Sequence, residues 1–252
     1  MRRFVAAVRF LTVIPFPGSW GTDEASLAGS TVFFPAVGLL IGFGAAGIAV
    51  CAVRWLPPGP AAALIVVALL AVSGGLHMDG LSDTADGLLS ARSRERALEI
   101  MRDSRVGAMG VIAVVCALML KFAAVASLPA AEIWRTALLM PVAGRAALVV
   151  TIALLPYARP EGGLAAPFYR KRSMLAALSA EVILLATAWL VLDVAGVIAA
   201  CASLAAVLIL AVYTYRRVGG ATGDTLGAAC EIAELVAAMA MAAWYFQARG
   251  HP

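Results

Sequence analysis

Long apolar runs separated by short polar segments dominate the chain. The runs recur at about the 20-residue length that crosses a bilayer as one helix. They predict seven spanning helices, at 32–53, 58–76, 108–128, 137–155, 174–192, 194–214 and 225–246. Because these helices take up most of the 252 residues, the predicted fold is all-α, a polytopic transmembrane helical bundle in which 1–252 form a single integral membrane domain. In the first run, Gly38, Gly42 and Gly44 predict close packing between helices.

The N-terminal stretch 1–17 predicts a further helix, lying in the membrane interface. It begins like a signal peptide, with two arginines near its start, but Arg9 interrupts the apolar part and no cleavage site of small residues follows. On a helix, Phe4, Val8 and Leu11 share one face, which suits an interfacial position.

Two of the polar segments on the side of the N-terminus carry candidate chemistry. The longer one, 77–107, contains the helix-forming stretch RSRERALEIMRD, in which Ala97, Ile100 and Met101 form an apolar strip. We expect a short cytoplasmic helix there, lying against the membrane face. The second segment, 215–224, is a glycine-rich turn. The first is the predicted active-site segment, and both are predicted to be cytoplasmic.

Composition and charge agree with this topology. Hydrophobic residues make up 63% of the chain and charged residues 13%, and the mean hydropathy is +0.94. Fourteen of the 19 Lys and Arg residues fall on one side of the predicted spans, which the positive-inside rule makes cytoplasmic. They are Arg2, Arg3, Arg9, Arg92, Arg94, Arg96, Arg102, Arg105, Arg159, Arg170, Lys171, Arg172, Arg216 and Arg217. The predicted location is the cell inner membrane, with the lipid bilayer as a partner.

The net charge of +4 therefore reports membrane orientation. No nucleic acid is predicted as a partner, because the chain has no basic stripe with interleaved aromatic residues. The sequence leaves the oligomeric state open, a homo-oligomer included.

Three carboxylates follow the second span at a helical spacing. Asp79, Asp83 and Asp86 stand at i, i+4 and i+7, which places them within about 60° of arc on one helix. Carboxylates so close together repel one another unless a cation neutralises them, and hard oxygen ligands suit Mg²⁺, Mn²⁺ or Ca²⁺. The structural alternative is a solvated helix end with Asp79 as its N-cap.

His77 stands two residues before Asp79, so on a continuous helix it faces the other way. The Gly74-Gly75 pair can break and redirect that helix. Metal ligand, phosphate contact and interface histidine all remain open for His77.

The stretch 102–107, RDSRVG, adds a second candidate group. Arg105 flanks Asp103 and is suited to hold a diphosphate. For the neighbouring Glu95 and Glu99, a surface helix with i,i+4 ion pairs is the better interpretation.

The third candidate group precedes and enters the last span. Gly219, Gly220 and Gly223 come before Asp224, which can cap the helix, and helix-terminal amides attract anions. Deeper in the spans lie Glu231 and Glu234, together with the single bases Lys121 and Arg145. These bases are expected to pair with the glutamates or to snorkel.

Carboxylates on a hard cation, arginines and a glycine turn predict phosphoryl transfer. The cation would neutralise diphosphate oxygens, and a free carboxylate would accept a proton from an attacking hydroxyl. A Ser-His-Asp arrangement does not compete, because the only histidines are His77 and His251.

Four segments together resemble one family, in order and over nearly the whole chain. They are FLTVIPFP at 10–17, HMDGLSDTADGL at 77–88, ERALEIMRDSRVGAMG at 95–110 and GGATGDTLGAACEIAE at 219–234. They resemble the adenosylcobinamide-GDP ribazoletransferases, also called cobalamin (5'-phosphate) synthases. The resemblance implies a Mg²⁺-dependent integral membrane enzyme of the late cobalamin pathway. Such enzymes join adenosylcobinamide-GDP to α-ribazole or its 5'-phosphate and release GMP.

A more remote resemblance is to the CDP-alcohol phosphotransferases, whose pattern is D-x2-D-G-x2-A-R-x8-G-x3-D-x3-D. Asp83, Asp86 and Gly87 fit its start, but Arg92 comes one residue late and the downstream half is not reproduced. A phosphotransferase for another alcohol is therefore the alternative enzyme. A cation-coupled transporter is a further alternative, although its site would more often lie at the midplane.

The resulting hypothesis assigns a role to each candidate residue. The metal site is formed by Asp79, Asp83, Asp86 and Asp103, and the base is Asp103 or Asp86. Substrate is bound by Arg105, Arg92, His77, Gly219, Gly220, Gly223 and Asp224.

Overall fold

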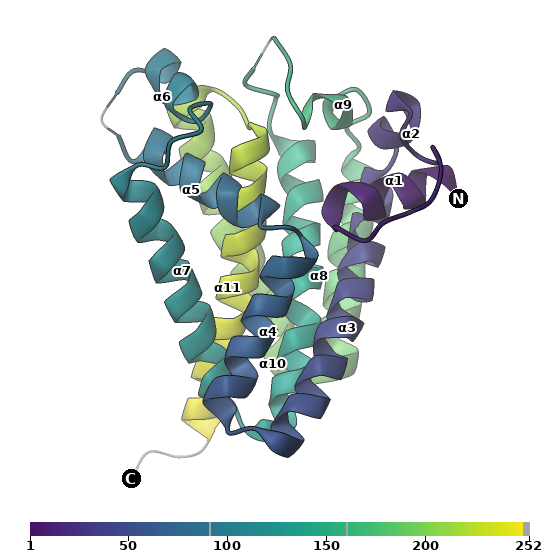
Figure 1. Cartoon of the computed structure of the whole chain (residues 1–252), viewed down its shortest axis with the longest axis vertical. Coiled ribbons are helices and arrows are strands. Elements are labelled where there is room, and N and C mark those ends of the chain that lie inside the picture. The colour runs from purple at the N-terminus through teal and green to yellow at the C-terminus, as the bar shows by residue number, and fades with distance from the viewer. Residues whose placement is uncertain (91, 160, 249–252) are drawn as a thin grey trace.

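The computed structural model describes residues 1–90, 92–159 and 161–248, and this part of the chain is helical without a β-sheet (Figure 1). The predicted all-α class is thereby confirmed. The helices are α1 (Arg2–Leu11), α2 (Glu24–Ala28), a 3₁₀ turn (Thr31–Phe33), α3 (Phe34–Trp55), α4 (Pro58–Val72), α5 (Leu76–Leu88), α6 (Arg94–Ile100), α7 (Ala108–Ala126), α8 (Ala130–Leu154), α9 (Ala166–Tyr169), α10 (Met174–Val218) and α11 (Gly223–Ala248).

Within the described residues, five helices are long and apolar enough to cross a bilayer: α3, α7, α8, α10 and α11. The bent pair α4 and α5 raises this number to six, so the predicted number of seven is not confirmed. Helix α10 is interrupted at Asp193, whose φ of 50° is not helical. A Cβ on Gly196 would meet the carbonyl oxygen of Ala188, which a straight helix would place about 12 Å away along its axis. The chain therefore turns back at the boundary predicted between 174–192 and 194–214.

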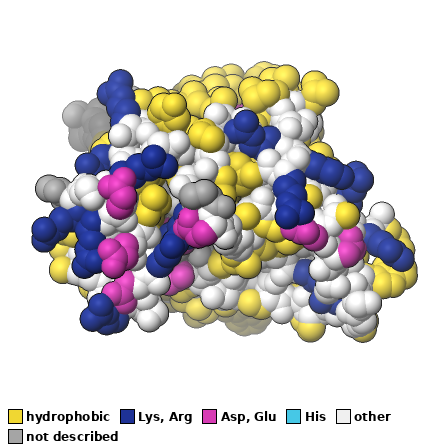
Figure 2. Space-filling view, turned by 90° about the horizontal axis from the view of Figure 1, so that it is seen from above, with side chains coloured by type: hydrophobic (Ala, Val, Ile, Leu, Met, Phe, Trp, Pro, Cys, Tyr) yellow, Lys and Arg dark blue, Asp and Glu magenta, His cyan; other side chains and the backbone are white. Residues whose placement is uncertain are grey.

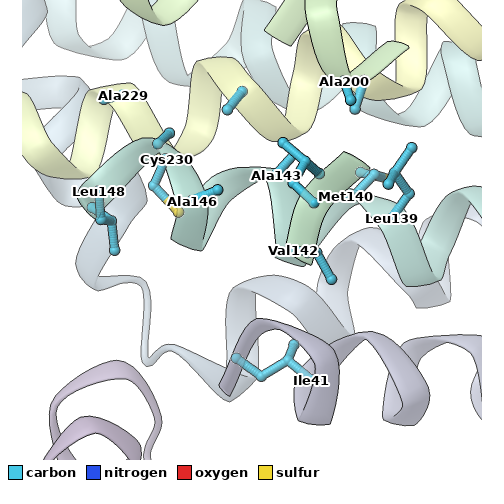
Figure 3. Close-up of a cluster of buried hydrophobic side chains, with 14 of the residues drawn as sticks. Ile41, Leu139, Met140, Val142, Ala143, Ala146, Leu148, Ala200, Ala229 and Cys230 are labelled. Atoms are coloured by element: carbon cyan, nitrogen blue, oxygen red, sulfur yellow. The ribbon is translucent and has the colours of Figure 1, made fainter. Parts of the chain in front are cut away.

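Helix α8 is the centre of the bundle. In its most apolar stretch, 89% of the residues are buried inside the protein. Figure 3 shows Ile41 of α3 on one side of α8, and Ala200 of α10 with Ala229 and Cys230 of α11 on the other. Small residues on the neighbouring helices allow this enclosure, because without bulky side chains the backbones can approach closely.

Two of the three glycines expected to allow close packing do so. A Cβ on Gly42 would lie 2.5 Å from the carbonyl oxygen of Leu138, and one on Gly38 would lie 2.8 Å from that of Pro141. The prediction for Gly44 is wrong, because nothing lies within 4 Å of a Cβ built there. It shares the helix with the other two but not the face that contacts α8.

A sharp bend between α4 and α5 creates a surface at one end of the bundle. Gly74 and Gly75 both adopt left-handed backbone conformations, with φ of +60° and +76°, and the two helices meet at 87°. This confirms the expected redirection at the glycine pair. Helix α5 consequently lies across the end of the bundle, and α4 is the part that runs through it (Figure 1).

The same end carries most of the charge. The N-terminus and the helices α1, α2, α6 and α9 lie there with α5, whereas α11 ends at the opposite side (Figure 1). Viewed from above, Lys and Arg side chains gather over this end together with Asp and Glu side chains (Figure 2). The predicted short helix is α6, and its Ala97 packs with Met101, which directly follows the helix, against Leu88 and Val218. The predicted N-terminal helix is α1, whose Val8 and Leu11 join the main core.

Gly42→Ala should destabilise the protein by about 1–3 kcal/mol, because the new methyl group overlaps the α8 backbone. Gly44→Ala is the matched control in the same helix, and it should leave stability unchanged or slightly raise it. Thermal unfolding in detergent measures both. Equal stability of the two variants would contradict the close contact of α3 with α8.

Candidate active site at one end of the bundle

Helix α5 crosses the start of α11 at two glycines. A Cβ on Gly80 would lie 2.7 Å from the carbonyl oxygen of Asp224, and one on Gly227 would lie 2.9 Å from that of His77. The backbones approach this closely only because neither crossing residue has a side chain. The crossing places Asp79 and Asp83 of α5 beside Asp224, although these residues are far apart in the sequence.

Two of the carboxylates brought together in this way, those of Asp79 and Asp83, differ from Asp224 in having no side-chain partner in the described structure. Among the described residues, neither Asp79 nor Asp83 takes part in a side-chain hydrogen bond or an ion pair. The pKa of Asp83 is raised to about 7. Partial burial is the largest cause, and repulsion from the carboxylates of Asp79 and Asp224 adds to it. The predicted stripe thus lies at a position where negative charge accumulates without full compensation.

As the side chains lie, no group of three His, Cys, Asp or Glu residues in the described part of the chain is arranged to hold a metal ion. The chemistry of the carboxylates nevertheless fits a hard cation. Mg²⁺ is usually held by one or two carboxylates together with substrate phosphates, so a preformed group of three is not needed.

Arg159 supplies the positive charge next to these carboxylates. Its Nη2 lies 2.7 Å from Oδ2 of Asp224, and its side chain is only 10% exposed. Sequence reasoning counted Arg159 for topology but missed it as a site residue. The reason is that a backbone contact places it there: the amide of Ala158 donates to the carbonyl of Ala221, and the amide of Ala221 donates to that of Pro156.

The glycine-rich turn at 219–223 allows this backbone contact between 156–158 and Ala221. Gly219 ends α10 with a φ of +76°, and a Cβ on Gly220 would meet the carbonyl oxygen of Pro156. Gly223 is the only one of the three glycines that lines the cavity described below.

The helix after the turn is capped differently from the expectation. Thr222 and Thr225 cap the start of α11 reciprocally, each side-chain oxygen accepting from the other residue's amide. The predicted capping role of Asp224 is therefore wrong. Asp79 likewise lies in the first turn of α5, whose N-cap is Gly75, so the N-cap alternative for Asp79 fails as well.

Asp86 has a specific structural contact. Its two carboxylate oxygens accept the backbone N–H groups of Gly107 and Gly110, at 2.7 and 2.8 Å. These amides stand at the N-terminus of α7, where intrahelical acceptors are missing. Asp86 therefore caps α7 from the neighbouring helix, and it ties the predicted active-site segment to the bundle.

Asp103 and the two predicted phosphate-binding arginines lie apart from this cluster. Asp103 pairs with Arg105 at 2.5 Å, and hydrogen bonding from Arg105 lowers the pKa of Asp103 to about 2. Arg105 and Arg92 are exposed on the charged end. The structure does not bring Asp103 into contact with Asp79 or Asp83.

A cavity of about 160 Å³ lies between α5, α8 and the start of α11. Its polar lining comes from His77, Asp79, Tyr157, Arg159 and Asp224, and the rest is mainly apolar. His77 is 3% exposed, and its Nδ1 has no hydrogen-bond partner among the described residues. A wider groove of about 1130 Å³ adjoins the cavity, since Asp79 lines both.

Below the cavity, four buried charges join three helices. Lys121 of α7 donates to Glu231 and Glu234 of α11 at 2.5 and 2.8 Å, and Arg145 of α8 donates to Glu234 at 2.5 Å. All four side chains are at most 7% exposed. The expected pairing of Lys121 and Arg145 with the glutamates is confirmed, and snorkelling is excluded by their burial.

Comparison with known proteins matches residues 3–242 to the family described as cobalamin-5-phosphate synthase. An adenosylcobinamide-GDP ribazoletransferase of Acetivibrio thermocellus is 39% identical over 92% of this chain and 94% of its own length. One from Roseiflexus sp. is 44% identical over 92% of this chain and 85% of its own. One from Klebsiella pneumoniae is 38% identical over 96% of this chain and 99% of its own length. No solved structure matches the chain significantly.

Asp86→Asn should lower the free energy of unfolding by about 1–2 kcal/mol, because an amide presents a donor to the α7 amides that the carboxylate now caps. Thermal unfolding in detergent measures this loss. Asp23→Asn at the start of the short helix α2 is the control for an exposed cap, and its effect should be smaller. If Asp86→Asn unfolded at the same temperature as the wild-type protein, the capping role of Asp86 would be contradicted.

Proposed function

The chain belongs to the cobalamin-5-phosphate synthase family, and on this premise we propose that it joins adenosylcobinamide-GDP to α-ribazole, or to its 5'-phosphate, with release of GMP. The observation that carries the proposal is the convergence of Asp79, Asp83 and Asp224 with Arg159 beside one cavity. The two carboxylates without partners, next to a buried arginine that is paired with Asp224, suit a diphosphate that arrives with a divalent cation.

The bond changes follow from the two substrates. A ribose hydroxyl of the acceptor attacks the phosphorus on the cobinamide side of the diphosphate. The bond from this phosphorus to the bridging oxygen breaks, and GMP leaves with that oxygen. The hydroxyl proton passes to a carboxylate, so the products are the phosphodiester and GMP.

Mg²⁺ would be held by Asp79 and Asp83 together with substrate phosphate oxygens, with Asp224 at the edge of the same cluster. When bound, it supplies positive charge that stabilises the diphosphate and the departing GMP. Asp86 retains a lone pair on each oxygen after capping α7, so its predicted place among the ligands stays a proposal.

Arg159 is the phosphate contact that we add to Arg105 and Arg92. It is the only Lys or Arg side chain among those that line the cavity in the described structure. Its ion pair with Asp224 holds the guanidinium in place before substrate arrives, which reduces the ordering needed on binding.

Of the two predicted bases, Asp103 is the weaker candidate. A carboxylate with a pKa near 2 accepts a proton poorly at neutral pH, and Arg105 occupies it. The proton acceptor is better sought among the carboxylates of α5.

The site is proposed to face the cytoplasm from the cell inner membrane. The support is the gathering of Lys and Arg at the end that carries the site, as the positive-inside rule requires (Figure 2). This side is also where nucleotide substrates are dissolved.

Asp83→Asn should reduce GMP release from adenosylcobinamide-GDP and α-ribazole by at least about 100-fold, because a carboxylate of the metal site is lost. GMP is measured by chromatography on purified protein with Mg²⁺. Asp193→Asn makes the same change at the exposed turn of α10 and should keep wild-type turnover. Near-normal turnover of folded Asp83→Asn would remove Asp83 from the site, and release of CMP from a CDP-alcohol instead would favour the alternative phosphotransferase.

Removal of divalent cations by EDTA should abolish GMP release, and added Mg²⁺ should restore it. Asp79→Asn should raise the Mg²⁺ concentration needed for half-maximal rate by about 10- to 100-fold. Full activity in EDTA would contradict the metal requirement. It would not contradict a role of the carboxylates in accepting the proton of the attacking hydroxyl.

A further inference from the structure

The inner part of the cavity has a chemistry that phosphate binding does not explain. Three phenylalanines line it: Phe168 meets Phe10 edge-on at 4.6 Å between ring centroids, and Phe34 edge-on at 5.4 Å. Phe34 and Phe168 are at most 1% exposed, whereas Phe10 is only partly buried, so the Phe10 ring presents the surface that a ligand would meet and the other two rings support it. A phosphate would gain nothing from this wall, whereas a flat aromatic ring would fit it.

Hydrogen-bond donors without partners accompany the aromatic wall. The hydroxyl of Tyr157 and Nε of Arg159 are buried, and neither has a partner among the described residues. Burial raises the pKa of Tyr157 above its ordinary value, so its hydroxyl remains a donor. Buried donors are normally satisfied, so these two indicate a ligand that brings an acceptor.

The volume of the cavity limits that ligand to about one ring system. Apolar protein cavities of about 150 Å³ bind benzene, and this cavity of about 160 Å³ opens further on the side of the exposed Asp79. A ring held against Phe10 would therefore leave its substituent at the carboxylates.

We propose that this cavity binds the benzimidazole ring of the acceptor, with the ring packed against Phe10, which Phe34 and Phe168 hold in place, and with the Tyr157 hydroxyl donating to its free nitrogen. The assignment rests on the proposed function, which supplies α-ribazole as the acceptor. The attached ribose then lies beside Asp79 and Asp224, where its hydroxyl has to be activated.

The guanine of the donor fits this cavity poorly. Guanine carries several donors and acceptors around its edge, and an apolar wall would leave most of them unpaired at a large cost. Benzimidazole has one free acceptor nitrogen and an otherwise apolar edge. The cavity therefore distinguishes the two aromatic bases that meet in the reaction.

Phe168→Leu should raise the KM for α-ribazole about 3- to 10-fold, because the aromatic contacts are lost while an apolar side chain remains. Tyr157→Phe should raise the same KM about 2- to 10-fold through one lost hydrogen bond. In both variants the KM for adenosylcobinamide-GDP should stay unchanged. Matched controls are Phe122→Leu on the exposed side of α7 and Tyr245→Phe, whose hydroxyl bonds to Glu132 in the described structure.

Equilibrium dialysis of α-ribazole against the full-length protein, without the donor, separates this proposal from the proposed function. Weaker binding by both cavity variants, with the wild-type affinity kept by both controls, supports the cavity even if wild-type protein releases no GMP. A wild-type protein that releases GMP while the cavity variants keep their α-ribazole affinity and KM would overturn the cavity assignment alone. An increased KM for adenosylcobinamide-GDP in place of α-ribazole would also overturn it. Thermal unfolding of each variant confirms that the comparison is between folded proteins.

Discussion

The site depends on the crossing of α5 and α11 at Gly80 and Gly227. At this crossing the backbones lie so close that a single methyl group on either residue would overlap the other helix. Asp79 and Asp83 are thereby placed beside Asp224, and the first turn of α11 becomes part of the cavity wall. The bend at Gly74 and Gly75 makes the crossing feasible, because it turns α5 across the end of the bundle.

The buried charges of Lys121, Arg145, Glu231 and Glu234 beneath the site hold α11 in register. Lys121 and Arg145 balance Glu231 and Glu234, so the network is neutral overall. A shift or rotation of α11 would separate these charges inside the bundle, where an uncompensated charge is costly. The network thus limits the positions that α11 can adopt, and with them the position of Asp224.

Some features of the site are encoded locally in the sequence, and others depend on contacts between distant segments. The spacing of Asp79, Asp83 and Asp86 was visible because helical periodicity is local, and α5 is a continuous helix as expected. Arg159 was missed because it stands in a short connection without periodicity, and only the pairing of 156–158 with 220–221 brings it to Asp224. The capping role of Asp86 could not be predicted either, because its partners Gly107 and Gly110 stand at the start of another helix, α7.

The amino-acid sequence is enough to predict the all-α membrane architecture, the charged end, the family and the carboxylate stripe. Each of these follows from composition, local periodicity or motifs that neighbouring residues carry. Only the tertiary structure shows that Asp86 caps α7 while Asp224 pairs with Arg159, and that aromatic side chains line a cavity beside them. These depend on which backbones approach closely, and such contacts are set by the packing of helices that lie far apart in the chain.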